Sequence, residues 1–401
     1  MGSEGDGRVD PLKGLLKLSA TEKAERGLEH TPAEIAQQPG TWITTFDRLH
    51  HRQTELQNFL SHAGLRCAPQ ERPVVFLIGA GTSDYIGRSL HHLLRSRWQC
   101  EVIPVASTSL LTDFPDYVLS GQRYLWISFS RSGDSPEGVA VLERALAECP
   151  GISHLLVTCH ANGRMNRAVE GRANCLSIVL DDATNDRGLA MTSSFTNMVL
   201  SGQILAHAWS MEEYETILRA LVSAGERFLP RAATLASELA QPGYKRVCFV
   251  GSGALVGTAL ECALKVLELT AGKVQTMSQP TLALRHGPMA ALDHETLFVA
   301  LISSQPQRRQ YEVDLLREIG SKDLVRTRVA VATEPESLRA EADFVVTPET
   351  LDPIPDLYRP VLDVIFGQLL GLFASIQSGL KPDLPSPNGV ISRVVQNVDI
   401  Y

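Results

Sequence analysis

Apolar residues in the first part of the chain recur at helical spacing. Thr31-Pro-Ala-Glu34 predicts a helix start, with Thr31 as the cap, proline at the first helical position and an acidic residue three positions after the cap. The run from Trp42 to Leu60 also has its apolar residues at helical spacing and predicts a second helix. We therefore expect a helical N-terminal extension.

From residue 73 onward, short continuous apolar runs alternate with helical segments such as Tyr85–Arg95 and Pro136–Glu148. Continuous apolar strands separated by helices are typical of a parallel sheet that is covered on both faces. The runs that we expect to form such strands are 73–79, 124–130, 154–159, 176–180, 246–251, 297–304, 329–333 and 344–347.

The second half of the chain repeats the order of the first. Gly251 lies 172 positions after Gly79, and Ser304 lies 174 positions after Ser130. This nearly constant offset indicates two copies of one unit, joined by an apolar helical segment near 195–240, and the period is too long for a solenoid. The expected fold class is α/β, with two tandem doubly wound parallel-sheet domains. The expected boundaries are 1–50 for the helical extension, 51–212 and 213–385 for the two domains, and 386–401 for a C-terminal tail.

Composition narrows the class of protein. The 401 residues include 37 Lys and Arg against 45 Asp and Glu, a net charge of −8, which gives no electrostatic reason to bind nucleic acid or an acidic membrane. We expect no membrane-spanning helix and no signal peptide, and hence a cytoplasmic protein. The seven cysteines form no CxxC pair, so we expect neither disulfides nor a zinc site. Most of the cysteines are expected to be small buried side chains.

In each repeat, one glycine-containing turn follows the first expected strand. These turns are Gly79-Ala-Gly81 and Gly251-Ser-Gly253. The dinucleotide-binding pattern requires a third glycine three residues later, where this chain has Asp84 and Val256. The turns are therefore interpreted as tight connections between strand and helix. The histidines lack metal-ligand spacing, so the sequence predicts neither a cofactor nor a metal.

The loop from Ser128 to Pro136 places four serines around one glycine, directly before a helix. A helix N-terminus offers backbone N–H groups and a positive dipole end, and the hydroxyls of Ser130, Ser132 and Ser135 add donors. This combination favours a phosphate monoester, although a solvated loop that caps a helix would have the same spacing. The second repeat has Ser303-Ser-Gln-Pro-Gln at this place, without most of the hydroxyls.

The second repeat supplies charged residues instead. Glu261, Lys265 and Glu268 lie on one face of an otherwise apolar helix expected over about 258–270. They form either a solvent-facing stripe of ion pairs or a carboxylate held beside a lysine for proton transfer at carbon. His286 follows on an expected loop, where it is either inert or able to move protons near neutral pH.

These motifs together resemble those of the sugar isomerase (SIS) domain family, over roughly residues 50–385. The similar segments are Gly79-Ala-Gly-Thr-Ser83, the loop ending in Ser-Arg-Ser-Gly-Asp-Ser135, and Glu261-CALKVLE268 followed by LRHGPMA. They are most similar to the isomerase half of glucosamine-6-phosphate synthase. HTPAEIAQQPGTW, Asn185-DRGLAMTSSF195 and SPNGVISRVVQNVDIY further resemble the galactosamine-6-phosphate deaminase/isomerase group, also labelled tagatose-6-phosphate ketose/aldose isomerase.

The resemblance implies roles for individual residues. Glu268 falls at the proton-transferring glutamate, His286 at the ring-opening histidine, and Lys265 at a lysine near C1 and C2 of the sugar. Arg131 replaces the family's glutamine and adds donors suited to phosphate. Because the histidine can come from a neighbouring subunit, we expect a homodimer or a higher homo-oligomer. The implied substrate-binding residues are Gly81, Thr82, Ser83, Ser130, Arg131, Ser132, Ser135, Thr192 and Ser193.

The chain departs from the synthase pattern at its end. The synthase has a tail lysine that forms a Schiff base with the ketose, whereas here no lysine follows Lys381 and the aligned position is near Gln396. A glutaminase domain is also absent from the sequence. Both features favour release of ammonia, and the expected function is conversion of galactosamine 6-phosphate to tagatose 6-phosphate and ammonia. The alternatives are an aldose–ketose isomerase of a hexose 6-phosphate, a glucosamine-6-phosphate deaminase and a non-catalytic sugar-phosphate sensor.

Overall fold

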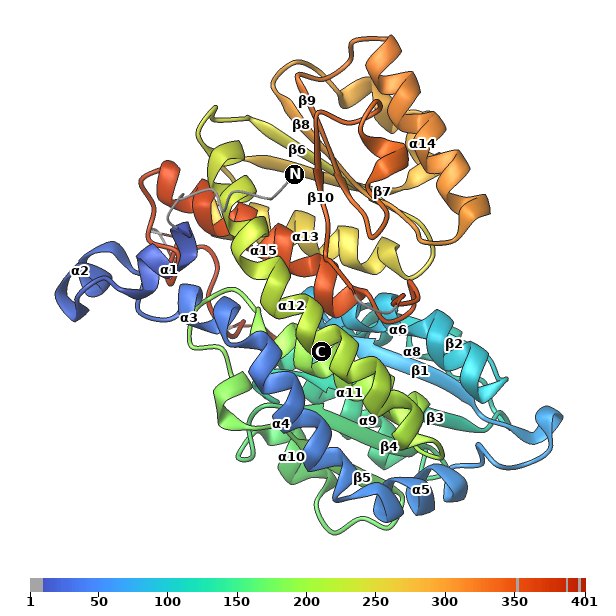
Figure 1. The fold of residues 1–401 in the computed structure, drawn as a ribbon. Coiled ribbons are helices and arrows are strands. Elements are labelled where there is room, and N and C mark those ends of the chain that lie inside the picture. The colour runs from blue at the N-terminus through green and yellow to red at the C-terminus, as the bar shows by residue number, and fades with distance from the viewer. Residues whose placement is uncertain (1–9, 351–352, 387–388, 396–397) are drawn as a thin grey trace.

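The structure is a computed structural model that describes residues 10–350, 353–386, 389–395 and 398–401. Two five-stranded parallel sheets, one from each half of the chain, face each other across a layer of helices (Figure 1). The strands of the first sheet are β1 (Val74–Gly79), β2 (Val102–Ala106), β3 (Tyr124–Ser130), β4 (Ser153–Thr158) and β5 (Cys175–Val179). Those of the second are β6 (Arg246–Gly251), β7 (Gln275–Pro280), β8 (Thr296–Leu301), β9 (Thr327–Val331) and β10 (Phe344–Val346).

The two sheets have the same topology. The strand order is β2-β1-β3-β4-β5 in the first sheet and β7-β6-β8-β9-β10 in the second, and every pairing is parallel. The duplicated doubly wound α/β fold predicted from the sequence is therefore confirmed. Two strands, β2 and β7, were not predicted. The expected strand 297–304 was too long, because β8 ends at Leu301 and the serines after it belong to a turn.

Fifteen α-helices and five short 3-10 helices occur in the described part of the chain. The α-helices are α1 (Pro11–Leu16), α2 (Ala20–Arg26), α3 (Thr31–Ala36), α4 (Gln38–His50), α5 (Gln53–His62), α6 (Thr82–Trp98), α7 (Ser107–Thr112), α8 (Phe114–Tyr117), α9 (Pro136–Glu148), α10 (Arg164–Val169), α11 (Ser193–Ala206), α12 (Met211–Ala240), α13 (Leu255–Leu269), α14 (Pro306–Ser321) and α15 (Pro360–Gln377). The 3-10 helices are η1 (Pro69–Glu71), η2 (Asp182–Thr184), η3 (Thr281–Arg285), η4 (Pro288–Ala291) and η5 (Glu336–Leu338).

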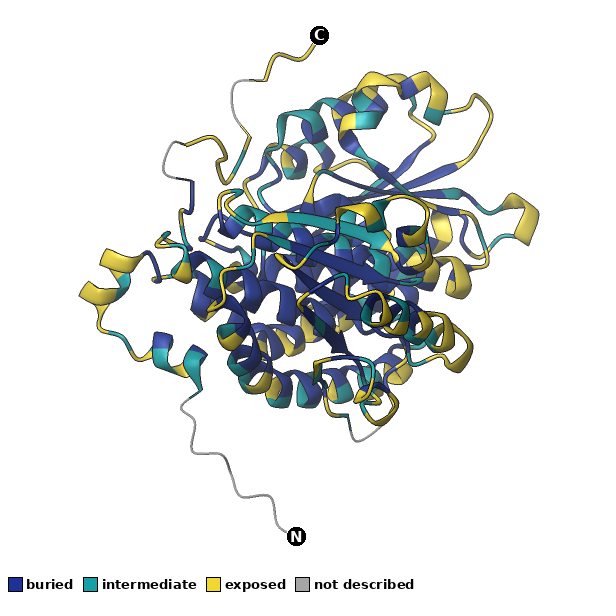
Figure 2. Ribbon diagram, turned by 90° about the horizontal axis from the view of Figure 1, so that it is seen from above, coloured by how far each residue is buried: buried dark blue, intermediate teal, exposed yellow. Residues whose placement is uncertain are grey.

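Helices α6, α11, α13 and α15 lie between the sheets and carry the main hydrophobic core (Figure 1). The central strands of both sheets are buried, the edge strands are partly exposed, and the outer helices expose one face (Figure 2). α6 and α13, the first helix after the glycine turn of each repeat, pack together closely at Gly257. A Cβ at this position would lie 2.5 Å from the backbone nitrogen of Ser89. Further along α13, Lys265 reaches Thr82 at the start of α6, so the two helices run antiparallel and the charged end of α13 lies beside the glycine turn of the first repeat.

The N-terminal helices α1, α3, α4 and α5 contribute residues to the core, whereas α2 buries none. Trp42 of α4 is fully buried and donates a hydrogen bond from its indole nitrogen to Thr196 of α11 (3.1 Å). The predicted helix over Trp42–Leu60 is interrupted, because α4 ends at His50 and α5 begins at Gln53. The predicted cap was wrong as well. Thr31 is the first residue of α3, and its hydroxyl and backbone nitrogen both donate to Asp383, far away in the sequence (2.7 Å each).

The structure bears on two composition-based expectations, and it corrects the one about the cysteines. α15 is long and apolar enough to cross a membrane by length and composition, although 83% of it is buried inside the protein. Its apolar character follows from its central position between the sheets. All seven cysteines are free, but only Cys159, Cys248 and Cys262 are buried, and the other four are partly exposed.

Candidate active site

The arrangement of strands β1 and β3 creates a crevice at their carboxyl ends. The chain leaves β1 towards β2 on one side and leaves β3 towards β4 on the other, so the two connections diverge. In open parallel sheets, ligands bind at such a switch point. The Gly79–Ser83 turn and the serine loop (Ser130–Pro136), both singled out in the sequence, meet here.

The turn after β1 depends on its two glycines. A Cβ on Gly79 would lie 2.3 Å from the carbonyl carbon of Ser83, and Gly81 has φ +55° and ψ −124°, a conformation that side-chain-bearing residues rarely adopt. The turn starts α6 at Thr82, earlier than the predicted Tyr85. Thr82 and Ser83 consequently lie buried in the first turn of the helix.

A cavity of about 160 Å³ lies between the β1 turn and the serine loop. The hydroxyl-bearing residues Ser83, Ser130, Ser132 and Ser135 line it, together with the first turn of α9. Ser130 Oγ accepts from the backbone nitrogen of Gly133 (3.0 Å) and Ser132 Oγ accepts from that of Asp134 (3.2 Å), which leaves both hydroxyl protons to be donated. Ser135 is the N-cap of α9, and no described side chain caps this helix end. The cavity therefore presents hydroxyls and a helix N-terminus to an anion.

Arg131 is buried beside the cavity, but its guanidinium is committed to the protein backbone. It donates to the carbonyl oxygens of Leu189 (3.2 Å) and Arg393 (2.7 Å). Arg393 in turn donates to the carbonyl oxygen of Asp186 (2.8 Å) and to the side chain of Asn185 (2.6 Å). Arg131 lines the cavity and joins the serine loop to the 185–189 segment and the C-terminal tail, and its predicted contact with phosphate stays a prediction.

The tail itself lines the cavity through Arg393, Val394 and Val395. Sequence reasoning missed Arg393, because the only signal was a basic residue in a tail matched by resemblance alone. The aligned tail position near Gln396 lies outside the described residues.

Thr192 and Ser193 do not line the cavity. Both are fully buried at the start of α11, where the Asp186 carboxylate accepts from their backbone nitrogens (2.7 and 3.0 Å). The hydroxyl of Ser193 also donates to the carbonyl oxygen of Glu34 (2.7 Å). Their place in the structure is that of a helix cap, and their predicted contact with substrate stays a prediction.

The charged residues of α13 form a buried cluster. Lys265 and Glu261 are fully buried, and the side chain of Glu268 is 25% exposed. Lys265 Nζ lies 2.6 Å from a carboxylate oxygen of Glu268 and 3.2 Å from one of Glu261. It also donates to the hydroxyl of Thr82 (3.0 Å), which donates to Glu261 (3.2 Å). These contacts exclude the solvent-facing stripe and link α13 to the turn that lines the cavity.

Protonation in the cluster is set by burial and by the opposite charges. Burial raises the pKa of Glu261 to about 8, although Lys265 acts in the opposite direction. Burial alone would lower the pKa of Lys265, but Glu261 and Glu268 outweigh it and raise that pKa. Lys265 is therefore a stable cation at neutral pH, held beside the partly exposed carboxylate of Glu268.

In the described part of the chain, no hydrogen bond or ion pair joins the His286 side chain to this cluster. His286 follows η3 on an exposed loop, as predicted, and is not among the residues that line the serine cavity. Among the described residues, no three His, Cys, Asp or Glu side chains are grouped as metal ligands.

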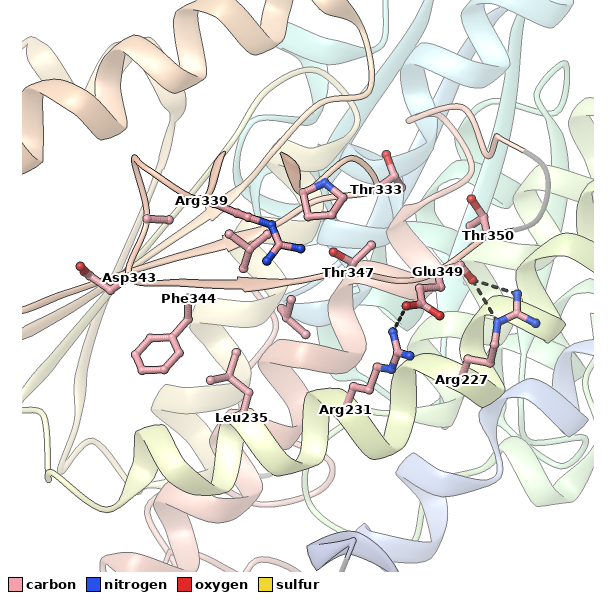
Figure 3. Close-up of a pocket in the computed structure, with 14 residues that line it drawn as sticks. Arg227, Arg231, Leu235, Thr333, Arg339, Asp343, Phe344, Thr347, Glu349 and Thr350 are labelled. Atoms are coloured by element: carbon pink, nitrogen blue, oxygen red, sulfur yellow. Dashed lines mark hydrogen bonds and ion pairs between the residues drawn. The ribbon is translucent and has the colours of Figure 1, made fainter. Parts of the chain in front are cut away.

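A larger cavity of about 940 Å³ lies between α12 and the β10 edge and contains none of the predicted site residues (Figure 3). Two of its arginines are paired within the protein. Arg231 forms an ion pair with Glu349, and Arg227 donates to the carbonyl oxygen of the same residue (2.9 Å).

No protein-family model matches the chain. It is 34% identical over 376 residues to the D-galactosamine-6-phosphate deaminase AgaS of Escherichia coli O157:H7, covering 92% of this chain and 95% of the relative. The chain belongs to the AgaS family. Two solved structures resemble the AgaS-family fold described above. The tagatose-6-phosphate ketose/aldose isomerase of Escherichia coli has a TM-score of 0.83 and 33% identity, covering 90% and 95% of the two chains. A Clostridium novyi NT protein that carries the same name provisionally has a TM-score of 0.91 and 30% identity, covering 96% and 98%.

Proposed function

We propose that this AgaS-family protein is an enzyme that converts galactosamine 6-phosphate to tagatose 6-phosphate and ammonia. The observation that carries the proposal is the direct link between an anion cavity and a proton-transfer pair. Ser83 lines the cavity, and its neighbour Thr82 accepts a hydrogen bond from Lys265, which holds Glu268 at 2.6 Å. A substrate anchored through its phosphate would extend its sugar chain towards Glu268.

Binding of the phosphate relies on neutral donors. Ser83, Ser130, Ser132 and Ser135 supply hydroxyls, and α9 supplies backbone N–H groups and the positive end of its dipole. Anchoring the phosphate aligns the reacting carbons with the base and reduces the entropic cost of the chemical step.

Proton transfer then follows on the open-chain aldose. Glu268 removes the C2 proton, giving an enolate with its negative charge on O1 and the amine on C2, and a proton from solvent then converts O1 to a hydroxyl. The carboxylic acid returns its proton to C1, and loss of one N–H proton to solvent leaves an imine at C2. Water adds to that imine and ammonia leaves, which gives the ketose 6-phosphate. Lys265 fixes the Glu268 carboxylate through their ion pair, and its charge stabilises the oxyanion that develops at O1.

Ring opening requires a further proton donor and acceptor, for which we propose His286 of a neighbouring subunit. The exposed position of His286, outside the cavity of its own chain, supports a homodimer or a higher homo-oligomer with shared sites. Mixing inactive His286→Ala and Glu268→Gln subunits tests this arrangement. Complementary sites should restore part of the activity, whereas no recovery in mixed oligomers would contradict the sharing. A metabolic role of this kind also favours a cytoplasmic location.

The second candidate is simple aldose–ketose isomerisation of a hexose 6-phosphate, favoured by the names of the two structural neighbours. It shares the proton shuttle with deamination and differs only in the group at C2. The glucosamine epimer is a further possible substrate. A sensor is disfavoured, because the N-terminal helices pack into the core through residues such as Trp42 instead of forming a separate unit.

Proton exchange at C2 in deuterated water tests the assignment of the base. Glu268→Gln should abolish exchange, because the amide cannot accept the proton, and should leave binding of inorganic phosphate within about twofold of wild type. Glu22→Gln, at an exposed position on α2, is the matched control. Exchange that persists in Glu268→Gln would show that another group is the base.

A further inference from the structure

The second domain has its own serine turn at the place where the first domain has the phosphate loop. Ser303 and Ser304 follow β8, the counterpart of β3, and α14 begins with Pro306 just as α9 begins with Pro136. The local geometry is also similar. The backbone nitrogen of Gln305 donates to Ser303 Oγ (3.0 Å), as that of Asp134 donates to Ser132 Oγ (3.2 Å).

An anion already occupies this second turn, and it belongs to the chain itself. The carboxylate of Asp356 accepts from the backbone nitrogen and the hydroxyl of Ser304 (2.8 Å each) and from the hydroxyl of Ser303. The fully buried Arg359 adds a charged donor at 3.1 Å. Asp356 is only 2% exposed, so solvent and solutes do not share these donors.

The two domains differ in the group that the corresponding aspartate carboxylate binds. The corresponding segment there also carries an aspartate, Asp186, but its carboxylate caps α11 and leaves the serine loop open. In the second domain, Asp356 points into the turn instead. Burial alone would raise the pKa of Asp356, but Arg359 and the serine donors outweigh burial and lower it, so the carboxylate is ionised at neutral pH.

We propose that Asp356 is a built-in substitute for phosphate that closes the second domain's oxyanion cradle, so that each chain binds one phosphosugar rather than two. The binding of a phosphosugar in the first domain rests on the proposed function, whereas the occupation of the second domain's serine turn by Asp356 does not. As a consequence, the two repeats have different roles. The first binds phosphate, and the second contributes the acid–base residues of α13.

Equilibrium dialysis with radiolabelled inorganic phosphate tests this inference on the intact protein. Wild type should bind one phosphate per chain. Asp356→Ala should bind two, because Ser303, Ser304 and Arg359 are left as donors around an empty position. The matched control is Asp363→Ala. Asp363 also pairs with the buried Arg359 (2.6 Å), but its removal leaves Asp356 in place, so this variant should still bind one.

The outcomes separate the two proposals. Two phosphates per wild-type chain would overturn the inference directly, whether or not the variants fold. No gain in Asp356→Ala over wild type would overturn it as well. No phosphate on wild type would contradict the proposed phosphate site of the first domain, and a gain of one on Asp356→Ala would even then support the role of Asp356.

Discussion

Glu34 provides a quantitative test of how the N-terminal helices hold the 185–189 segment beside the cavity. One carboxylate oxygen of Glu34 accepts from the backbone nitrogens of Arg187 (2.5 Å) and Gly188 (3.3 Å). The other oxygen is buried without a hydrogen-bond partner among the described residues. Burial, followed by the nearby Asp186, raises the pKa of Glu34 from 4.5 to about 7.

This shift makes stability depend on pH in a defined direction. Because the folded-state pKa lies above the unfolded one, ionisation of Glu34 opposes folding. The penalty is absent below about pH 4.5, grows as the pH rises and is complete above about pH 7. The difference between the two pKa values corresponds to about 3 kcal/mol.

Glu34→Gln removes the charge and keeps an oxygen that can accept from the two backbone nitrogens. Relative to wild type, its free energy of unfolding should change little at pH 4.5 and rise by about 3 kcal/mol at pH 8. Urea unfolding followed by circular dichroism across this range measures the difference, with Glu25→Gln, at an exposed position on α2, as the control. A difference between Glu34→Gln and wild type that does not vary with pH would refute the reasoning.

Three further predictions concern the site. Lys265→Met should abolish turnover and lower the free energy of unfolding by about 1–3 kcal/mol, because the buried Thr82 hydroxyl and the carboxyl group of Glu261 lose their donor; an active or equally stable variant in the same assays would contradict the role of the cluster. Arg393→Ala should raise KM about tenfold with kcat nearly unchanged, because it loosens the tail over the phosphate cavity, and unchanged steady-state kinetics would argue against that role. Gly81→Ala should lower the free energy of unfolding by about 1–3 kcal/mol through backbone strain, measured by urea unfolding against Gly14→Ala, whose added Cβ meets no neighbour within 4 Å.

The sequence predicted the repeated sheet because its central strands are buried on both faces and therefore apolar throughout. β2 and β7 escaped prediction because each is the outer neighbour of the first strand in its sheet and is only partly buried. β7 has the sequence Gln275-TMSQP280, and β2 contains Pro104, so neither resembles a buried strand. The order of the strands, and hence the crevice at the switch point, became visible only in the structure.

The serine loop and the α13 cluster could be found from the sequence, since each is a short segment with an unusual local pattern. The carboxylates that organise the site could not. Asp356 and Asp383 act on helix starts or turns that lie up to 354 positions away in the chain, and no spacing rule connects an aspartate with a partner at such a distance. The same reason explains why the partners of Arg131, which include the carbonyl oxygen of Arg393 in the tail, were not predicted.

Ammonia release by the purified protein, measured with galactosamine 6-phosphate and glucosamine 6-phosphate side by side, tests the central claim most directly. The account predicts release from galactosamine 6-phosphate in preference to its epimer, and loss of that release in Glu268→Gln. Release mainly from glucosamine 6-phosphate would contradict the proposed substrate while keeping the mechanism. No ammonia from either sugar would contradict deamination itself.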